Sequence, residues 1–257
     1  MKIFKILSLS LLLLFCTSVK AQFARFPMNG VIEYEKRVNI FALIKRTITK
    51  DTERWLAPEF EKYKKNQPQF KVSKSTLSFS KDKTLFTPGF EEVNNQNPIG
   101  WHPLLAQFNT VYTDLSTQTS IVQKKLFEQA YLLKDTTRSI KWKMTNETRE
   151  IAGYSCRRAN AVIMDSIYVV AFYTDQIPVS GGPEIFTGLP GMILGVALPH
   201  DNVTWFATSV IDKPLEKPLS APVKGKVLTE TGLNKTLESL IKDEGAWFKS
   251  VLKYYLL

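Results

Sequence analysis

Residues 182–194 read GPEIFTGLPGMIL and concentrate glycine and proline within an otherwise apolar run. Gly188 and Gly191 can adopt positive φ without a steric penalty, and Pro190 fixes φ at about −65°. Together these residues predict a tight turn. The turn leads directly into an apolar stretch, so we expect a buried strand to begin at Met192.

We call Gly188–Gly191 the GLPG turn. In a structural interpretation, the chain reverses sharply here because a broad sheet bends, and Leu189 fills its core. In a functional interpretation, the glycines let the main chain approach a ligand or partner closely, and Glu184, Phe186 and Leu189 line that contact. The exposure of Leu189 and Phe186 distinguishes the two interpretations, because a contact needs them accessible.

Alternation of apolar and polar residues dominates the rest of the chain. In Val31–Val38, the side chains of Ile32, Tyr34 and Val38 fall on one face and those of charged residues on the other. From Phe70 the period is again two, and a turn at Lys81–Lys83 predicts a hairpin. Nine further strands are expected at Thr110–Leu115, Thr119–Phe127, Tyr131–Leu133, Ile140–Met144, Arg149–Ala152, Cys156–Met164, Ile167–Tyr173, Met192–Leu198 and Val203–Ile211.

Two regions have helical spacing instead. Asn39 is placed to cap residues 40–65, which Pro58 interrupts, so we expect two short helices or a helix and a loop. Apolar residues from Leu233 to Tyr255 recur mostly at intervals of three and four, which predicts a C-terminal amphipathic helix packed on the sheet. Thr229 or Thr231 is available as its cap. The expected fold is therefore mainly β with α: a single curved antiparallel sheet or half-barrel with a C-terminal helix.

The order of residues in Phe186–Leu194 resembles the signature of the GLPGLI family, secreted proteins of Bacteroidetes-type bacteria, with Met192 in place of leucine. Trp142 followed by residues 151–159, and residues 170–178, are similar to two further segments of that family. The resemblance covers roughly residues 131–210. It implies a secreted domain and no particular activity.

The tryptophan strand and the following Gly-Tyr-x-Cys strand also resemble exported proteins with a curved, lipoprotein-carrier-like sheet. This resemblance implies that the concave face shelters an apolar ligand. Five aromatic residues are candidates to line it: Trp142, Tyr154, Phe172, Trp205 and Phe206.

Residues 1–21 combine two early lysines, an apolar core over Ile6–Phe15 and a small residue, Ala21, before the expected cleavage point. This pattern predicts a secretory signal peptide. A lipoprotein alternative would use Cys16, but Phe15 precedes it where a lipobox needs a small residue. The apolar core is too short to span a bilayer as a helix.

The mature chain, residues 22–257, is expected to be a single exported domain, in the periplasm or at the cell surface. Removal of the signal takes away three lysines and no acidic residue, so the net charge falls from +10 to +7. The positive charges are scattered, and no nucleic-acid-binding motif is present, so we expect no nucleic acid partner. Peripheral contact with an anionic membrane through lysines of the C-terminal helix is one alternative.

Few residues are available for catalysis. Cys156 stands alone in the mature chain and reads as a buried, inert thiol, and the two histidines, His102 and His200, lie in separate loops. No zinc-binding spacing, GxSxG motif, Walker loop or dinucleotide fingerprint occurs. The sequence therefore predicts no catalytic residues, no cofactor and no metal.

The leading hypothesis is an exported, non-catalytic binding or accessory protein of the cell envelope, with an apolar ligand or an envelope protein as its partner. One alternative is a hydrolase whose dispersed site includes His102, His200, Asp201 and Glu184. Another is a docking partner of an outer-membrane transport complex that uses the GLPG turn as its contact edge. Besides the turn, the candidate binding residues are Glu184, Phe186, Trp142, Trp205 and His200.

Overall fold

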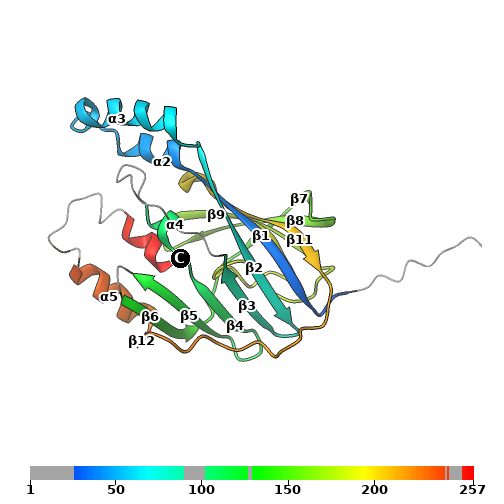
Figure 1. Ribbon diagram of the computed structural model, residues 1–257. Helices are drawn as coiled ribbons and strands as arrows, with labels where there is room; N and C mark the ends of the chain where they lie inside the picture. The colour runs from blue at the N-terminus through cyan, green and yellow to red at the C-terminus, as the bar shows by residue number, and fades with distance from the viewer. Residues whose placement is uncertain (1–25, 90–101, 127–128, 241, 243–250) are drawn as a thin grey trace, which may run out of the picture.

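The computed structural model describes residues 26–89, 102–126, 129–240, 242 and 251–257. Its strands form one sheet of twelve, in the order β12-β6-β5-β4-β3-β2-β1-β11-β10-β9-β8-β7 (Figure 1). The strands are β1 Asn29–Asn39, β2 Phe70–Ser80, β3 Lys83–Pro88, β4 Thr110–Asp114, β5 Thr119–Leu126, β6 Gln129–Thr136, β7 Lys143–Ile151, β8 Tyr154–Ile163, β9 Ile167–Thr174, β10 Met192–Leu198, β11 Val203–Ile211 and β12 Lys226–Leu228.

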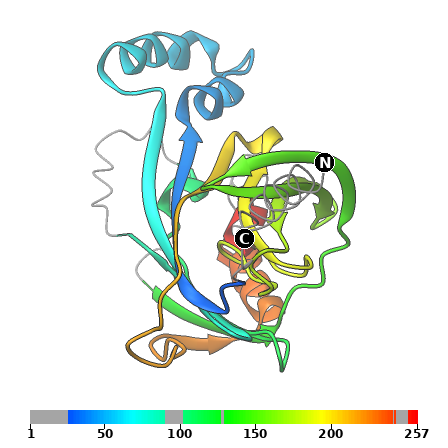
Figure 2. The ribbon, with the colours of Figure 1, turned by 90° about the vertical axis from the view of Figure 1, so that its right-hand side faces the viewer.

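Two meanders meet at β1. Strands β1 to β6 pair in chain order, β7 to β11 do the same, and β1 pairs with β11 to join the halves. These pairs are antiparallel, whereas β12 runs parallel to β6. Figure 2 shows the sheet curving around an interior that contains the last residues of the chain. The predicted curved, mainly antiparallel sheet is confirmed.

Two strands differ from the prediction. Ile140–Met144 and Arg149–Ala152 were expected to be separate strands, but β7 joins the last two residues of the first to most of the second, across an irregularity in register between Met144 and Thr148. Ile140, Lys141 and Trp142 lie outside the strand, so the first prediction is wrong for them. β12 was not predicted at all. Its three residues show no alternation, and they become a strand through pairing with β6.

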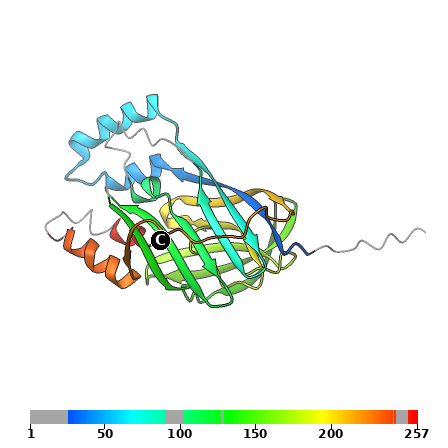
Figure 3. The ribbon, with the colours of Figure 1, turned by 60° about the horizontal axis from the view of Figure 1, so that its bottom comes forward.

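Two helices follow β1, as one of the alternatives predicted. Asn39 caps α2 (Ile40–Thr47) by accepting a hydrogen bond from the Ala42 main-chain nitrogen at 3.1 Å. Pro58 was expected to interrupt the helical pattern, but it lies inside α3 (Glu53–Asn66) and does not end it. The break lies earlier, between Thr47 and Glu53, where the Thr52 hydroxyl donates to the Thr47 main-chain oxygen at 2.8 Å. Figure 3 shows α2 and α3 extending beyond one end of β1 and β2.

The C-terminal helix is confirmed as α5, Glu230–Leu240. The Gly232 nitrogen donates to the Thr229 hydroxyl at 3.1 Å, so Thr229 is its cap. The predicted continuation through 241 and 243–250 lies outside the described residues, as do the expected signal peptide at 1–21 and most of the loop before His102. Three short elements complete the fold: α4 Pro103–Ala106, η3 Pro199–Asp201 and η4 Leu252–Leu256.

Candidate ligand-binding site

Strand alternation points two lysines into the core. Lys36 shares the inner face of β1 with Tyr34 and Val38, and it is 9% exposed. Lys124 lies on the inner face of β5, between buried Val122 and Leu126 in the alternation, and it is 2% exposed. Sequence analysis missed both lysines. The sequence contained a pattern that could have identified them, because each lysine lies two positions away from buried residues of the same strand and therefore on the same face.

Glu184, in the segment that leads to the GLPG turn, supplies the opposite charge. It is buried and accepts a hydrogen bond from the Asn109 side-chain nitrogen at 3.1 Å. Its backbone has φ 51°, a left-handed conformation that is uncommon for a residue other than glycine. The fold therefore holds a buried carboxylate in an unfavourable local conformation, a combination typical of functional sites.

These three charged groups influence one another through a poorly solvated interior. Burial lowers the pKa of Lys36, and it lowers the pKa of Lys124 to about 8, while the charge of Glu184 opposes both shifts. Burial raises the pKa of Glu184, and the two lysines oppose that shift. With two lysines facing one carboxylate, the interior favours an additional negative charge.

A pocket opens at the ends of β1, β2 and β11 beside α4. Its enclosed space is about 20 Å³, room for about one water-sized group, and the value of about 430 Å³ also counts the space between atoms and the open solvent at its mouth. The buried side chains of Lys36, Ser75, Glu184 and Trp205 line it. Lys71 and exposed Lys74 line it as well and add positive charge. We call this the Lys36 pocket.

Two polar atoms in the Lys36 pocket are buried and have no hydrogen-bond partner. They are the Ser75 hydroxyl oxygen and the indole nitrogen of Trp205. Buried polar groups in folded proteins are almost always paired, so each such exception requires an explanation. The Lys36 ammonium lies 5.1 Å from the centroid of the Trp205 ring. Three groups that can donate hydrogen bonds therefore line one pocket.

The GLPG turn forms part of the interior beside this pocket. Phe186 and Leu189 are 1% and 2% exposed, and the Phe186 ring packs 6.1 Å from that of Trp205. The Ser180 hydroxyl donates to the Leu189 main-chain oxygen at 2.6 Å, and the Trp142 indole nitrogen donates to the Thr187 oxygen at 2.8 Å. This burial favours the structural interpretation of the turn.

The structure does not bring the five candidate aromatic residues together. Trp205 and Phe206 are neighbours in β11, so their side chains point to opposite faces of the sheet. Phe206 lies 6.2 Å from Phe172 and beneath the guanidinium of Arg149, at 4.7 Å. Trp205 instead faces the interior.

Of the four histidine and carboxylate candidates for hydrolysis, the structure brings His102 and Asp201 together on Tyr254 and leaves His200 and Glu184 elsewhere. His200 is exposed beside Tyr168, and Glu184 bonds to Asn109. His102 and buried Asp201 both contact Tyr254, whose ring lies 4.9 Å from His102 and whose hydroxyl donates to Asp201. These contacts anchor Tyr254 and supply no hydrogen-bonded nucleophile and base.

His102 has a structural role of its own. Its Nδ1 accepts a hydrogen bond from the Leu104 main-chain nitrogen at 3.2 Å and caps α4. Burial lowers its pKa to about 4, and the charges of Arg46 and Lys36 act in the same direction. His102 is therefore neutral at pH 7.

We expect His102 to make the fold sensitive to mild acid. The stabilisation of the folded state by neutral His102 is complete above about pH 6.5, the pKa of histidine in the unfolded chain. It is lost as the pH falls towards 4, because the unfolded chain binds the proton at a higher pH than the folded protein does. Between pH 7.5 and 5.0, wild type should lose about 2 kcal/mol of unfolding free energy more than His102→Asn, which keeps a capping side chain. Urea unfolding of both proteins at both pH values measures this, and equal pH dependence would contradict it.

Part of the chain matches the model of a protein family of unknown function. The model of that family, described as a protein of unknown function (Porph_ging), matches residues 161–195, which include the GLPG turn. No curated protein matches the sequence. Two structures of PNGF-II, in different space groups, resemble it with 16% and 18% identity and a TM-score of 0.49 each. They cover 78% and 79% of this chain, which spans 31% of each PNGF-II chain.

Within the described ranges, no group of three or more His, Cys, Asp or Glu residues is arranged to hold a metal ion. No helix of the described part is both long and apolar enough to cross a membrane. Across the same residues, no catalytic constellation is evident.

Proposed function

We propose that this chain is an exported, non-catalytic binding protein of the cell envelope, related to the GLPGLI family, and that the Lys36 pocket binds a small oxyanion. The ligand group would be a carboxylate or a phosphate. The observation that carries the proposal is the pair of unpaired, buried polar atoms, on Ser75 and Trp205, in a pocket that also contains a buried ammonium group.

The chemistry of the pocket suits an acceptor of several hydrogen bonds. The Trp205 indole N–H can only donate, and the Lys36 ammonium also only donates. A ligand oxygen would complete the hydrogen bonding of both and of the Ser75 hydroxyl. Lys71 and Lys74 add positive potential along the approach. Oxyanions meet these requirements better than an apolar molecule, which would leave the buried donors unpaired.

Ser75→Ala tests the proposal because it has opposite effects on stability and on binding. In the free protein it removes an unpaired buried hydroxyl, so stability should stay equal or rise by about 1 kcal/mol. With inorganic phosphate or succinate as the probe, affinity should fall about fivefold, and Lys36→Met should reduce it at least tenfold. Calorimetry measures the affinities, and the indole ¹⁵N signal of Trp205 reports the site.

Matched controls lie outside the pocket. Ser78 is on the opposite face of β2 from Ser75, and Lys65 is exposed on α3. Ser78→Ala and Lys65→Met should bind like wild type. If neither probe binds wild type, or if the pocket variants bind as well as the controls, the Lys36 pocket is not the oxyanion site.

A further inference from the structure

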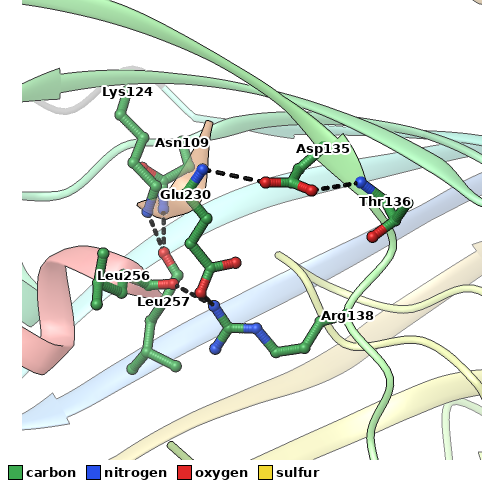
Figure 4. A network of polar contacts seen from close by, with 8 residues as sticks. All are labelled: Asn109, Lys124, Asp135, Thr136, Arg138, Glu230, Leu256 and Leu257. Atoms are coloured by element: carbon green, nitrogen blue, oxygen red, sulfur yellow. Dashed lines mark hydrogen bonds and ion pairs between the residues drawn. The ribbon is translucent and has the colours of Figure 1, made fainter. Parts of the chain in front are cut away.

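A second polar site surrounds residues 251–257 and adjoins the Lys36 pocket, which Gln107 also lines. Four side chains from three parts of the chain donate hydrogen bonds to main-chain oxygens of this segment, and Figure 4 shows those of Asn109, Lys124 and Arg138. The contacts are Gln107 to Tyr254 at 2.9 Å, Arg138 to Leu256 at 3.1 Å, Asn109 to Leu257 at 3.2 Å, and Lys124 to Leu257. The acceptors are main-chain oxygens and not side chains, so these contacts hold the backbone of the segment and do not select its sequence.

The donors are held in place by other contacts. Arg138 forms an ion pair with Glu230 in the first turn of α5, and the Asp135 carboxylate accepts a hydrogen bond from the Glu230 main-chain nitrogen at 3.1 Å (Figure 4). Asn109 also donates to Glu184 at 3.1 Å. Donors that are fixed by their surroundings lose less freedom on binding, which is a property of built sites.

The segment that occupies the site leaves part of it unsatisfied. The Asn109 side-chain oxygen and Nη1 of Arg138 are buried without a hydrogen-bond partner, and Asn109 is 2% exposed. The segment adopts a tight helical turn over Leu252–Leu256, in which the Leu257 nitrogen bonds to the Tyr254 oxygen at 3.4 Å. That N–H therefore does not reach Asn109.

An extended peptide would complete these hydrogen bonds. Its N–H and C=O groups point sideways and are not used within the segment, so one N–H can pair with the Asn109 oxygen and one C=O with Arg138. The side chains of Val251, Tyr254, Tyr255 and Leu257 are all buried, so the space around the backbone is shaped for apolar and aromatic residues.

We propose that the concave face carries a peptide-binding site, occupied here by residues 251–257, that accepts an extended apolar segment of another protein in their place. The incoming peptide binds through its main chain to Gln107, Asn109, Lys124 and Arg138. Its aliphatic and aromatic side chains replace those of the resident segment. This inference does not depend on oxyanion binding in the Lys36 pocket.

The resident segment can be weakened without changing the donors. The Tyr254 hydroxyl donates to buried Asp201, which also lies 3.8 Å from the Arg46 guanidinium, so Tyr254→Phe removes an anchor and keeps the aromatic ring. The probe is a fluorescent synthetic peptide with the sequence of residues 251–257, VLKYYLL. It should bind Tyr254→Phe about tenfold more tightly than wild type, as measured by fluorescence anisotropy on the full mature chain.

Two changes should abolish that gain. Adding Arg138→Ala to Tyr254→Phe should weaken binding about tenfold, since a charge-assisted hydrogen bond is lost. A peptide with methylated main-chain nitrogens should bind at least tenfold more weakly, because it offers no N–H to Asn109. Ser78→Ala, on the outer face of β2, serves as the unaffected control.

Displacement has a direct readout. When the peptide saturates the protein, hydrogen exchange within residues 251–257 of the chain should become at least tenfold faster, while exchange in β1 and β2 stays unchanged. Unchanged protection of 251–257 at saturation would overturn the proposal. Equal binding of the plain and methylated peptides, or by the variants with and without Arg138, would also overturn it.

Discussion

Gly191→Ala is expected to prevent stable folding. A Cβ atom at this position would lie 2.1 Å from the Thr174 main-chain oxygen and 2.8 Å from its carbonyl carbon, and the backbone has φ 139°. The obstruction is backbone of β9, which cannot rotate away as a side chain can. The clash and the unfavourable φ together should cost more than about 4 kcal/mol, a large part of the stability of an ordinary domain.

Gly188→Ala is the matched comparison. Gly188 also has positive φ, at 91°, but its added Cβ would meet Trp142 at 3.6 Å, an ordinary contact distance. Backbone strain of about 1–2 kcal/mol is then the whole cost, and the protein should stay folded. Soluble yield, circular dichroism and urea unfolding of both variants measure the difference. A Gly191→Ala protein as stable as Gly188→Ala would contradict the close packing of the GLPG turn against β9.

Glu184→Gln is expected to destabilise the protein by about 3–5 kcal/mol at pH 7. Glutamine keeps the size of the side chain and can still accept the hydrogen bond from Asn109. It removes the negative charge that opposes the lowered pKa values of Lys36 and Lys124. Both lysines are nearly fully buried, so their ammonium groups would be left without this countercharge.

The pH dependence of the unfolding free energy tests whether the two lysines cause this loss of stability. A lysine whose pKa is lower in the folded state weakens folding below its unfolded pKa of about 10.4, and the penalty disappears as the pH rises above that value. The deficit of Glu184→Gln relative to wild type should therefore be largest near neutral pH and shrink as the pH rises through the folded pKa values of the two lysines. The share that comes from Lys124 should be lost by about pH 8, its folded pKa in wild type, and the share from Lys36 by about pH 10. Urea unfolding across this range measures it, with Glu59→Gln, on the exposed surface of α3, as the control. A deficit that stays constant would mean that the lysines are not the cause.

Asn109 connects the two proposed sites. Its side-chain nitrogen donates both to Glu184, in the Lys36 pocket, and to the Leu257 main-chain oxygen, in the peptide site. The two acceptors fix which end of the amide points where, so the unpaired oxygen of Asn109 is a consequence of the network and not of an arbitrary orientation.

Much of the fold could be predicted from the chain itself. Alternation with period two located β1, β2 and β11, because a strand with one buried face must alternate. Continuous apolar runs located β9 and β10, which are buried over nearly their whole length. The cap at Asn39 was also predicted, and so were two helices, but the break between them was expected at Pro58 and lies instead between Thr47 and Glu53. The burial of Leu189 agrees with the structural interpretation of the GLPG turn.

The same strand patterns also contained information about two residues of the candidate site. Lys36 is in phase with Tyr34 and Val38, and Lys124 is in phase with Val122 and Leu126, so their inward direction could have been predicted. It could not have been predicted that the two lysines face the same carboxylate. β1 and β5 are separated in the sheet by β2, β3 and β4, and the curvature of the sheet brings their inner faces together around Glu184.

Local residues were enough to predict most of the strands, the helix caps and the direction in which each side chain leaves its strand, because these depend on residues within a few positions of one another. β12 is an exception, because it becomes a strand only through pairing with the distant β6. The tertiary structure alone decided that Gln107, Asn109, Lys124 and Arg138 meet around residues 251–257, over separations of 118–148 residues. Such a meeting depends on the summed twist and register of a twelve-stranded sheet, which no local pattern encodes.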